Sequence, residues 1–295
     1  MVERRSLLDP GFEGIARTAL IPLAARARAR VHSDLAFADP VAEDVAAQLA
    51  DCGLGPDFDR LAADRAMQRG CILRAAWFDR MAGDFLDRHP AAGVVNLGAG
   101  LDTAFHRLRR TCPDWQGHWW DIDRPGMVAL HRRLVPAARR HHLVARDVGD
   151  PAWWDDIPDL PALCVIAVGL LMYLAPEQVE RLFADAADLA RAGGIPLRLV
   201  FDYLSPAAAA FGGWNPSIAA TAGGWGATPF RWSLSRPEDV LAWMPGGRLV
   251  ARADLTAGMG GMASLTGAAY RWWHGGAALH GCAAIEIAGN GKPLR

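Results

Sequence analysis

A glycine-containing segment in the first half of the chain is the strongest candidate for a ligand site. Gly98-Ala99-Gly100 directly follows an apolar run over residues 93–97, and a helical pattern begins soon afterwards. A glycine turn between a strand and a helix lets the backbone approach a bound nucleotide-like ligand closely. We therefore predict that Gly98, Ala99 and Gly100 bind a cofactor.

Two acidic residues follow roughly twenty positions later, where a carboxylate at a strand end accepts hydrogen bonds from both hydroxyls of a ribose. They are Asp121 and Asp123, at the end of the next apolar run. The alternative is that one of them caps the next helix while the other binds the ribose, since Pro125 suits a first helical turn. We assign both to cofactor binding.

The residues after the glycine turn argue against a dinucleotide cofactor. A dinucleotide-binding turn has a third glycine where this chain has Thr103, and Asp102 would place a carboxylate beside a pyrophosphate. S-adenosylmethionine contains a ribose but no phosphate, and its charged amino-acid end is compatible with Asp102. A nicotinamide-dependent oxidoreductase is thus disfavoured, and failure to bind NAD or NADP would exclude it.

Asp147-Val148 ends the third apolar run. An acid at this position can accept a hydrogen bond from the amino group of adenine, while the valine packs on the ring. Equally, Asp147 or Asp150 can cap the helix that starts near Pro151. The sequence alone favours neither interpretation.

These segments require a particular order of elements to bring them together. From about residue 90 onward, short apolar runs alternate with helical segments. The predicted strands cover residues 93–97, 118–122, 142–146, 163–168, 196–202, 248–253 and 282–287. Nearly continuous apolar strands that alternate with helices indicate an α/β fold with a doubly wound, mostly parallel sheet of seven strands.

The organisation outside the sheet is predicted from helical spacing and from glycine. Residues 1–90 are expected to form a helical N-terminal cap, and residues 91–295 an α/β core with a substrate-side insertion around 204–235, all in one compact unit. Glycines interrupt the connection between the last two strands. It therefore lacks a helix of useful length, and these strands can pair antiparallel.

The composition excludes several functions. The 31 Lys+Arg and 32 Asp+Glu give a net charge of -1, which offers no electrostatic case for nucleic acid or an anionic membrane. Lys292 is the only lysine, so Schiff-base chemistry would have to use the C-terminal tail. The five cysteines are scattered and indicate a reducing cytoplasm rather than disulfides or a zinc site. We expect a cytoplasmic protein that acts on a small molecule without a metal or a membrane.

Three motifs in order resemble those of the leucine carboxyl methyltransferase family, whose bacterial branch includes polyketide O-methyltransferases. They are Asn-Leu-Gly-Ala-Gly-Leu-Asp-Thr at 96–103, Trp-Asp-Ile-Asp-Arg-Pro at 120–125 and Gly-Leu-Leu-Met-Tyr-Leu at 169–174. The likeness runs from about Thr18 to Tyr203. Little is similar beyond Ser205, where substrate contacts vary.

The resemblance implies a class I, Rossmann-like methyltransferase that binds S-adenosylmethionine at the carboxyl ends of the first strands. Carried over by position, Gly98 approaches the methionine moiety and Asp123 the ribose. Asp147 and Val148 hold the adenine, and Arg74 meets the cofactor carboxylate from the helical cap.

Two positions depart from the family pattern. Val168 stands where the family usually has a glutamate near the amino-acid end of the cofactor, and Ala104 replaces a common arginine. The loss of the glutamate weakens cofactor binding unless Asp102 compensates. A catalytically idle or repurposed relative is therefore the second hypothesis.

Methyl transfer from a sulfonium requires mainly alignment of the acceptor. A carboxylate acceptor needs no base, whereas a phenol, with a pKa of about 10, benefits from one. No histidine falls at a predicted strand end that faces the pocket; those considered are His106, His141, His142, His274 and His280. This slightly favours a carboxylate. The predicted function is O-methylation of a small-molecule carboxylate or phenol in natural-product biosynthesis.

Candidate acceptor contacts are few. Tyr203, at the end of a predicted strand, is the best single candidate. Trp214 and Trp225 can line an apolar site or simply anchor their own loop. Arg26 is more easily explained on a solvent-facing helix than as a clamp for a carboxylate.

Overall fold

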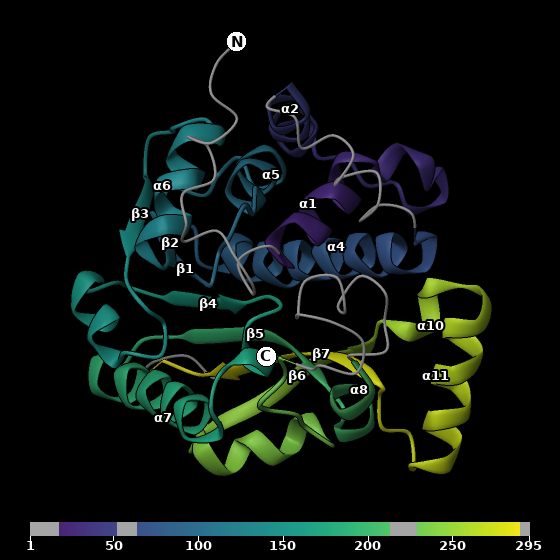
Figure 1. Cartoon of the computed structure of the whole chain (residues 1–295). Coiled ribbons are helices and arrows are strands. Elements are labelled where there is room, and N and C mark those ends of the chain that lie inside the picture. The colour runs from purple at the N-terminus through teal and green to yellow at the C-terminus, as the bar shows by residue number, and fades with distance from the viewer. Residues whose placement is uncertain (1–17, 52–63, 213–228, 290–295) are drawn as a thin grey trace.

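A seven-stranded sheet forms the centre of the protein in the computed structural model, which describes residues 18–51, 64–212 and 229–289 (Figure 1). The strand order is β3-β2-β1-β4-β5-β7-β6. The strands are β1 (Gly93–Leu97), β2 (Trp119–Asp123), β3 (His141–Ala145), β4 (Leu163–Ala167), β5 (Leu197–Leu204), β6 (Gly247–Asp254) and β7 (His280–Ile287). Each predicted strand is present with its ends displaced by at most two residues, which confirms the predicted fold class.

The direction of the strands determines where a ligand can bind. Strands β1 to β5 run parallel, and β7 pairs antiparallel with both β5 and β6. The chain winds outward in both directions from β1 and β4, so the connections after these two strands separate at their carboxyl ends. Such a switch point is the usual ligand site of an open α/β sheet.

Helices cover both faces of the sheet (Figure 1). On one face, α4 (Arg65–Arg88) buries Trp77, Phe78 and Phe85 against β1, β4 and β5. On the other face, α7 (Pro176–Gly193) packs Phe183 against residues of the same strands. Because α4 shares a core with the sheet, it forms a layer of the fold, and the boundary at residue 90 between cap and core stays a prediction.

The N-terminal helices lie over the carboxyl edge of the sheet. α1 (Leu20–Ala27) and α2 (Pro40–Leu49) pack on each other, and α1 also packs on α4. Asp39 caps α2 by accepting a hydrogen bond from the amide of Ala42 at 3.1 Å. Asp64 caps α4 in the same way through Met67, at 3.0 Å.

The remaining helical segments connect the strands. They are η2 (Ala29–Val31), η3 (Ser33–Leu35), α5 (Ala104–Thr111), α6 (Pro125–Leu134), η5 (Pro151–Asp156), η6 (Leu171–Tyr173), α8 (Pro206–Phe211), η8 (Pro237–Trp243), α10 (Thr256–Met259) and α11 (Gly261–Trp273). Within these described parts of the chain, none of the helices is both long and apolar enough to cross a bilayer.

The connection between β6 and β7 corrects one prediction. The two strands do pair antiparallel, but α10 and α11 lie between them. The glycines end and join these helices rather than interrupt them, since Gly260 takes a φ of 82° between α10 and α11 and Gly275 a φ of 61° after α11. Gly267, inside α11, faces Thr256 so closely that a Cβ there would overlap its side chain.

Candidate functional site

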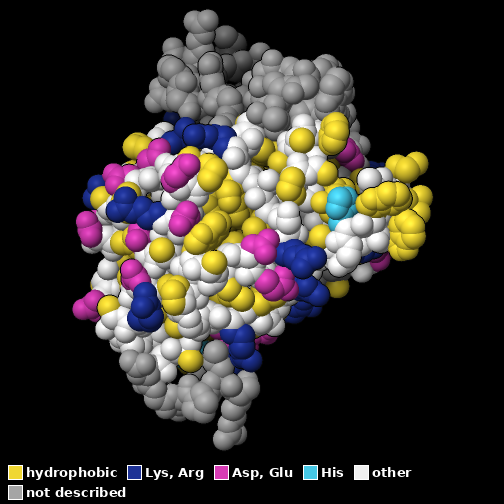
Figure 2. All heavy atoms as spheres, turned by 90° about the horizontal axis from the view of Figure 1, so that it is seen from below, with side chains coloured by type: hydrophobic (Ala, Val, Ile, Leu, Met, Phe, Trp, Pro, Cys, Tyr) yellow, Lys and Arg dark blue, Asp and Glu magenta, His cyan; other side chains and the backbone are white. Residues whose placement is uncertain are grey.

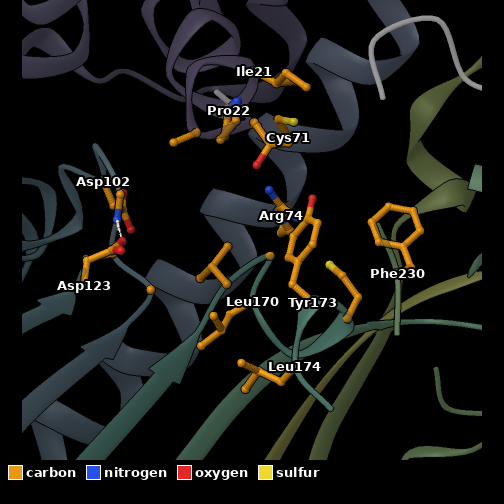
Figure 3. A pocket seen from close by; sticks show the side chains of 18 of the residues that line it. Ile21, Pro22, Cys71, Arg74, Asp102, Asp123, Leu170, Tyr173, Leu174 and Phe230 are labelled. Carbon is orange, nitrogen blue, oxygen red and sulfur yellow. Dashed lines mark hydrogen bonds between the residues drawn. The ribbon is translucent and has the colours of Figure 1, made fainter. Parts of the chain in front are cut away.

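A cavity with a volume of about 560 Å³ opens at the carboxyl edge of the parallel strands. In Figure 3, Asp102 and Asp123 lie at one side of it and Phe230 at the other, with Arg74 and Tyr173 between them. Eight of the predicted cofactor residues line it: Arg74, Gly98, Ala99, Gly100, Asp102, Asp123, Asp147 and Val148. The size is within the range of ~300–1,000 Å³ that small-molecule pockets usually have.

The glycine turn after β1 forms the floor at one end of the cavity. Gly98 and Gly100 have φ values of 61° and 56°, a region that L side chains rarely adopt. A Cβ on Gly98 would lie 2.7 Å from Cδ1 of Leu170. A hydrogen bond from outside the cavity stabilises the turn: Nδ1 of His131 donates to the carbonyl of Gly100 at 2.9 Å.

Two carboxylates at the ends of β2 and β3 face this end of the cavity. The Oδ2 atom of Asp123 accepts a hydrogen bond from the amide of Gly100 at 2.7 Å, and burial raises the pKa of this carboxyl. Asp147 accepts a hydrogen bond from the amide of Gly149 at 2.8 Å. The capping role that the sequence left open belongs to Asp150, which accepts from the amide of Ala152 at 3.0 Å.

A buried ion pair stands in the middle of the cavity wall. Arg74 extends from α4 and donates from Nη1 to Oδ2 of Asp202 on β5 at 2.8 Å. Asp202 is fully buried and also accepts from the amide of Gly169 at 2.6 Å. Burial opposes ionisation of this carboxyl, but the neighbouring Arg74 and His280 lower its pKa to about 2. Asp202 is therefore an anion at neutral pH.

A second group of charges supports the glycine turn from the side of α1. Arg26 is only 5% exposed, lines the cavity and donates from Nε to Oδ2 of Asp39 at 3.1 Å. Arg107 donates to the same oxygen at 2.6 Å. Despite burial, the two guanidinium groups lower the pKa of Asp39 to about 2. The prediction of a solvent-facing Arg26 is wrong, because its helix packs on the body of the protein.

The sequence matches a known family over the part of the chain that builds this end of the cavity. Residues 19–187 match the model of the leucine carboxyl methyltransferase family. The chain belongs to this family. Its members are methyltransferases that use S-adenosylmethionine, which agrees with the resemblance of the three motifs.

One relative in sequence and one solved structure are similar to this chain. The tetracenomycin polyketide synthesis O-methyltransferase TcmP of Streptomyces glaucescens is 30% identical over 234 residues, which cover 79% of this chain and 80% of that protein. Human N-acetylserotonin methyltransferase, solved in complex with S-adenosylmethionine, aligns with a TM-score of 0.45 and 12% identity. That alignment covers 78% of this chain and 59% of the human one.

Asp121 of the methyltransferase does not line the cavity, so of the two acids of the D-x-D motif assigned to the cofactor only Asp123 faces it. Two residues along a strand share a face but lie ~6.6 Å apart, so only Asp123, at the strand end, reaches the cavity. Asp121 is buried and accepts hydrogen bonds from Asn96 at 2.9 Å, Trp119 at 2.7 Å and His141 at 2.7 Å. Its role is to hold the sheet together beneath the site.

The surroundings of Asp121 include a second histidine. Ligand atoms of Asp121, His131 and His141 lie within 4.8 Å of one another, a spacing that suits a metal ion. The hydrogen bonds of Asp121, and that of His131 to the glycine turn, already account for this arrangement. Burial opposes ionisation of Asp121, but His141 and His131 lower its pKa.

Tyr203 does not line the cavity either. Successive side chains of a strand point to opposite faces, and Asp202 and Leu204 take the side of the cavity. Tyr203 is 2% exposed and fills the space above Gly281, where a Cβ would overlap its ring. Burial raises the pKa of its hydroxyl. The substrate contact at Tyr203 therefore stays a prediction that the lining of this cavity does not support.

The aromatic residues that do line the cavity are Tyr173 and Phe230, whose ring centroids are 5.4 Å apart. Phe230 belongs to the described part of the predicted insertion, and Leu204 lies at its start. Trp214 and Trp225 lie outside the described residues.

His280 is a site residue that the sequence analysis missed. It lines the cavity, and its Nε2 atom lies 3.1 Å from Oδ2 of Asp202. It pairs with Leu204 across the sheet, because the start of antiparallel β7 meets the carboxyl end of parallel β5. The predicted strand begins at residue 282, two residues after the start of β7, which places His280 outside the strand.

Val168 lies at the end of β4 and lines the cavity, as the family glutamate is expected to do. Asp102 also lines the cavity, but its Oδ1 atom already accepts a hydrogen bond from the amide of Thr103 at 2.7 Å, just before α5, and lies 3.7 Å from Arg26. Part of the interaction capacity of this carboxylate is therefore used within the protein rather than toward a ligand.

Proposed function

We propose that this methyltransferase transfers a methyl group from S-adenosylmethionine to the phenolic hydroxyl of a small, largely apolar acceptor in natural-product biosynthesis. The observation that carries the choice of a phenol is His280, held by Asp202 at the wall of the cavity. The polyketide O-methyltransferase among the relatives supports the class of acceptor.

The end of the cavity at β1 and β2 fits the cofactor. The glycine turn leaves room where any side chain would collide with Leu170, so a ligand can approach the backbone of Gly98. Asp123 offers a carboxylate for the ribose hydroxyls, and Asp147 with Val148 offers an acceptor and an apolar wall for adenine. When bound, S-adenosylmethionine supplies a methyl group already activated on a sulfonium.

Arg74 is expected to hold the carboxylate of the cofactor. Its Nη1 atom is used by Asp202, and the rest of the guanidinium faces the cavity beside Gly169. A guanidinium has five N–H donors, so the ion pair leaves donors for a second carboxylate. Asp202 thus fixes the orientation of Arg74, and the other N–H donors of the guanidinium remain available for a ligand.

The opposite end of the cavity fits an apolar acceptor. Its walls come from η6, from the end of β5 and from the segments that follow, through Met172, Tyr173, Leu204, Phe230 and Met259. Aromatic and thioether side chains suit a flat, apolar ring. These apolar walls suit a phenol or a related ring, and Arg231 also lines the cavity.

His280 is the group that can take the proton of the acceptor. Because Asp202 is ionised, Nε2 of His280 carries the hydrogen of their contact, and Nδ1 of the neutral ring is left as an acceptor. S-Adenosylmethionine would supply the methyl group and leave as S-adenosylhomocysteine when its carbon–sulfur bond breaks, and Nδ1 of His280 would take the hydroxyl proton of the acceptor. The Asp202 carboxylate stabilises the resulting imidazolium, as in other aspartate–histidine pairs.

The test compares acceptors and variants with the same purified protein. Radiolabelled S-adenosylmethionine is used to measure methyl transfer to matched pairs of phenols and aromatic carboxylates. His280→Gln should lower kcat for the phenols by ~10²- to 10³-fold, because general-base catalysis contributes effects of this size. The affinity for S-adenosylhomocysteine should not change in this variant.

The matched control is His142→Gln, since His142 is exposed on β3, outside the cavity lining. It should behave like the wild type. Faster methylation of carboxylates than of phenols, with full activity in His280→Gln, would falsify the choice of acceptor and support the carboxylate. Absence of binding of either form of the cofactor in calorimetry would contradict the function itself.

A further inference from the structure

The helix α11 is exposed along almost its whole length. Four of the six exposed large hydrophobic side chains in the described part of the chain belong to it: Met262 at 76%, Leu265 at 65%, Trp272 at 81% and Trp273 at 77%. Figure 1 shows the helix at the edge of the molecule, and Figure 2 shows hydrophobic side chains gathered at that edge. Two neighbouring exposed tryptophans are unusual on a surface that only meets water.

The exposed side chains form one stripe. At ~100° per residue, Met262, Leu265, Ala269, Trp272 and Trp273 fall within a sector of about 100°. Their spacing of three, four and three residues is that of a helix seam that contacts another helix.

The opposite side of α11 is the side that faces the protein. Gly267 points away from the stripe and is buried against Thr256. The stripe therefore points outward, and no side chain of the described residues buries it.

The charge of the helix indicates the kind of partner. Its only charged residue is Arg271, which forms an ion pair with Asp254 on β6. Helices that lie in a membrane interface are rich in Lys and Arg on their polar face, whereas α11 has only Arg271, which is paired with Asp254. An uncharged apolar stripe of this kind fits the surface of another protein.

The residues of the stripe are spaced evenly along the sequence on both sides of Gly267. Met262 and Trp272 are each five residues from it, and Leu265 and Ala269 are each two residues from it. In an antiparallel pair of identical helices, Met262 of one copy therefore meets Trp272 of the other, and Leu265 meets Ala269. Each large side chain lies opposite a smaller or flexible one, which is what a two-fold symmetric interface requires.

We propose that α11 pairs antiparallel with α11 of a second copy of this chain and forms the apolar centre of a homodimer. At ~150–250 Å² per tryptophan, the exposed fractions leave on the order of 300 Å² on the two indoles alone. A stable interface buries about 800 Å² on each partner, so neighbouring surface completes the contact. The expected dimer therefore dissociates on dilution rather than being obligate.

The test is sedimentation velocity of the full chain between about 1 and 100 µM, because the association of a dissociating dimer depends on protomer concentration. The wild type should move from monomer to dimer over this range. Leu265→Asp and Trp272→Asp should each remain monomeric, because a charge would be buried in the apolar seam. Val31→Asp is the matched control, since Val31 is 61% exposed on η2 and lies outside α11; it should dimerise like the wild type.

Cysteine cross-linking tests the antiparallel arrangement. A mixture of Leu265→Cys and Ala269→Cys chains should form an oxidised dimer faster than either variant alone. A monomeric wild type at the highest concentration overturns the proposal, as does a dimer that persists in Leu265→Asp. So does a monomer that sediments with phosphatidylglycerol vesicles and loses this binding in Trp272→Asp, because the stripe would then face a membrane.

Discussion

Replacing Asp202 by asparagine tests whether the buried ion pair beneath the cavity stabilises the fold. The carboxylate is fully buried, and it accepts hydrogen bonds from Arg74 at 2.8 Å and from the amide of Gly169 at 2.6 Å. Asparagine has nearly the same shape, but it carries no charge and has one acceptor oxygen, so it keeps only one of these two hydrogen bonds. The change therefore removes the charge together with one hydrogen bond, and it leaves the guanidinium of Arg74 buried without a counterion.

The size of the effect follows from the pKa of Asp202. A fall from 3.8 to about 2 corresponds to a stabilisation of about 2.4 kcal/mol at neutral pH, at ~1.36 kcal/mol per pKa unit. Breaking a buried pair by removing one partner costs ~3–5 kcal/mol. We expect Asp202→Asn to lower the free energy of unfolding by about 3 kcal/mol at pH 7.

The stabilisation that Asp202 contributes should decrease at acidic pH. Because the folded protein lowers the pKa of Asp202, its stabilisation is complete above the unfolded value of about 3.9 and is lost as the pH falls towards 2. The difference between the wild type and Asp202→Asn, measured by urea unfolding with circular dichroism, should thus shrink between pH 5 and pH 3. A difference below ~1 kcal/mol at pH 7, or one that does not change with pH, would refute the reasoning.

A surface pair provides the matched control for this prediction. Asp156 forms an ion pair with Arg146 at 2.8 Å, but 32% of the Asp156 side chain and 44% of the Arg146 side chain are exposed. Asp156→Asn should lower the free energy of unfolding far less than Asp202→Asn does, because solvent screens exposed pairs. In the double variant Asp202→Asn with Arg74→Met, the loss should be smaller than the sum of the single losses.

Two further predictions concern the two ends of the cavity. Gly98→Ala should weaken binding of S-adenosylhomocysteine in calorimetry by at least ~10-fold, because a Cβ at this positive φ would lie 2.7 Å from Leu170. Gly126→Ala, where a Cβ has no neighbour within 4 Å, should bind it like the wild type. Phe230→Ala should raise KM for a phenolic acceptor several-fold, as expected for ~1–2 kcal/mol of lost aromatic contact, and leave the affinity for S-adenosylhomocysteine unchanged. Equal losses of both affinities would show that Phe230 supports the fold rather than the acceptor.

The strands could be predicted because burial of a parallel sheet on both faces leaves a direct signal. Each of them is a short apolar run between helical segments, and all seven appear in the structure. The cofactor end of the cavity follows from the same pattern, since the residues at the ends of β1, β2 and β3 meet at one edge. The pattern does not distinguish Asp121 from Asp123. Both side chains lie on the same face of β2, and only their distance from the end of the strand decides which one reaches the cavity.

The acceptor end could not be predicted in the same way. Tyr203 and Asp202 are adjacent, and only the pleat of β5 decides which of them faces the cavity. His280 reaches the site because β7 runs antiparallel, so its first residue rather than its last lies at the functional edge. The glycines around α11 suggested a loop because the sequence does not show whether a glycine ends a helix or interrupts one.

The order in which the chain builds the two ends of the cavity has an evolutionary consequence. The glycine turn, Asp123 and Asp147 all come from the segment before residue 150, whereas Leu204, Phe230 and His280 come from the final third. Under the proposed roles of the two ends, mutations in the last third that keep Asp202 can change which molecule is modified and leave the cofactor end unchanged. A new specificity could be engineered by exchanging the segment after β5 between relatives. The exchanged segment would be held in place by the pairing of β7 with β5.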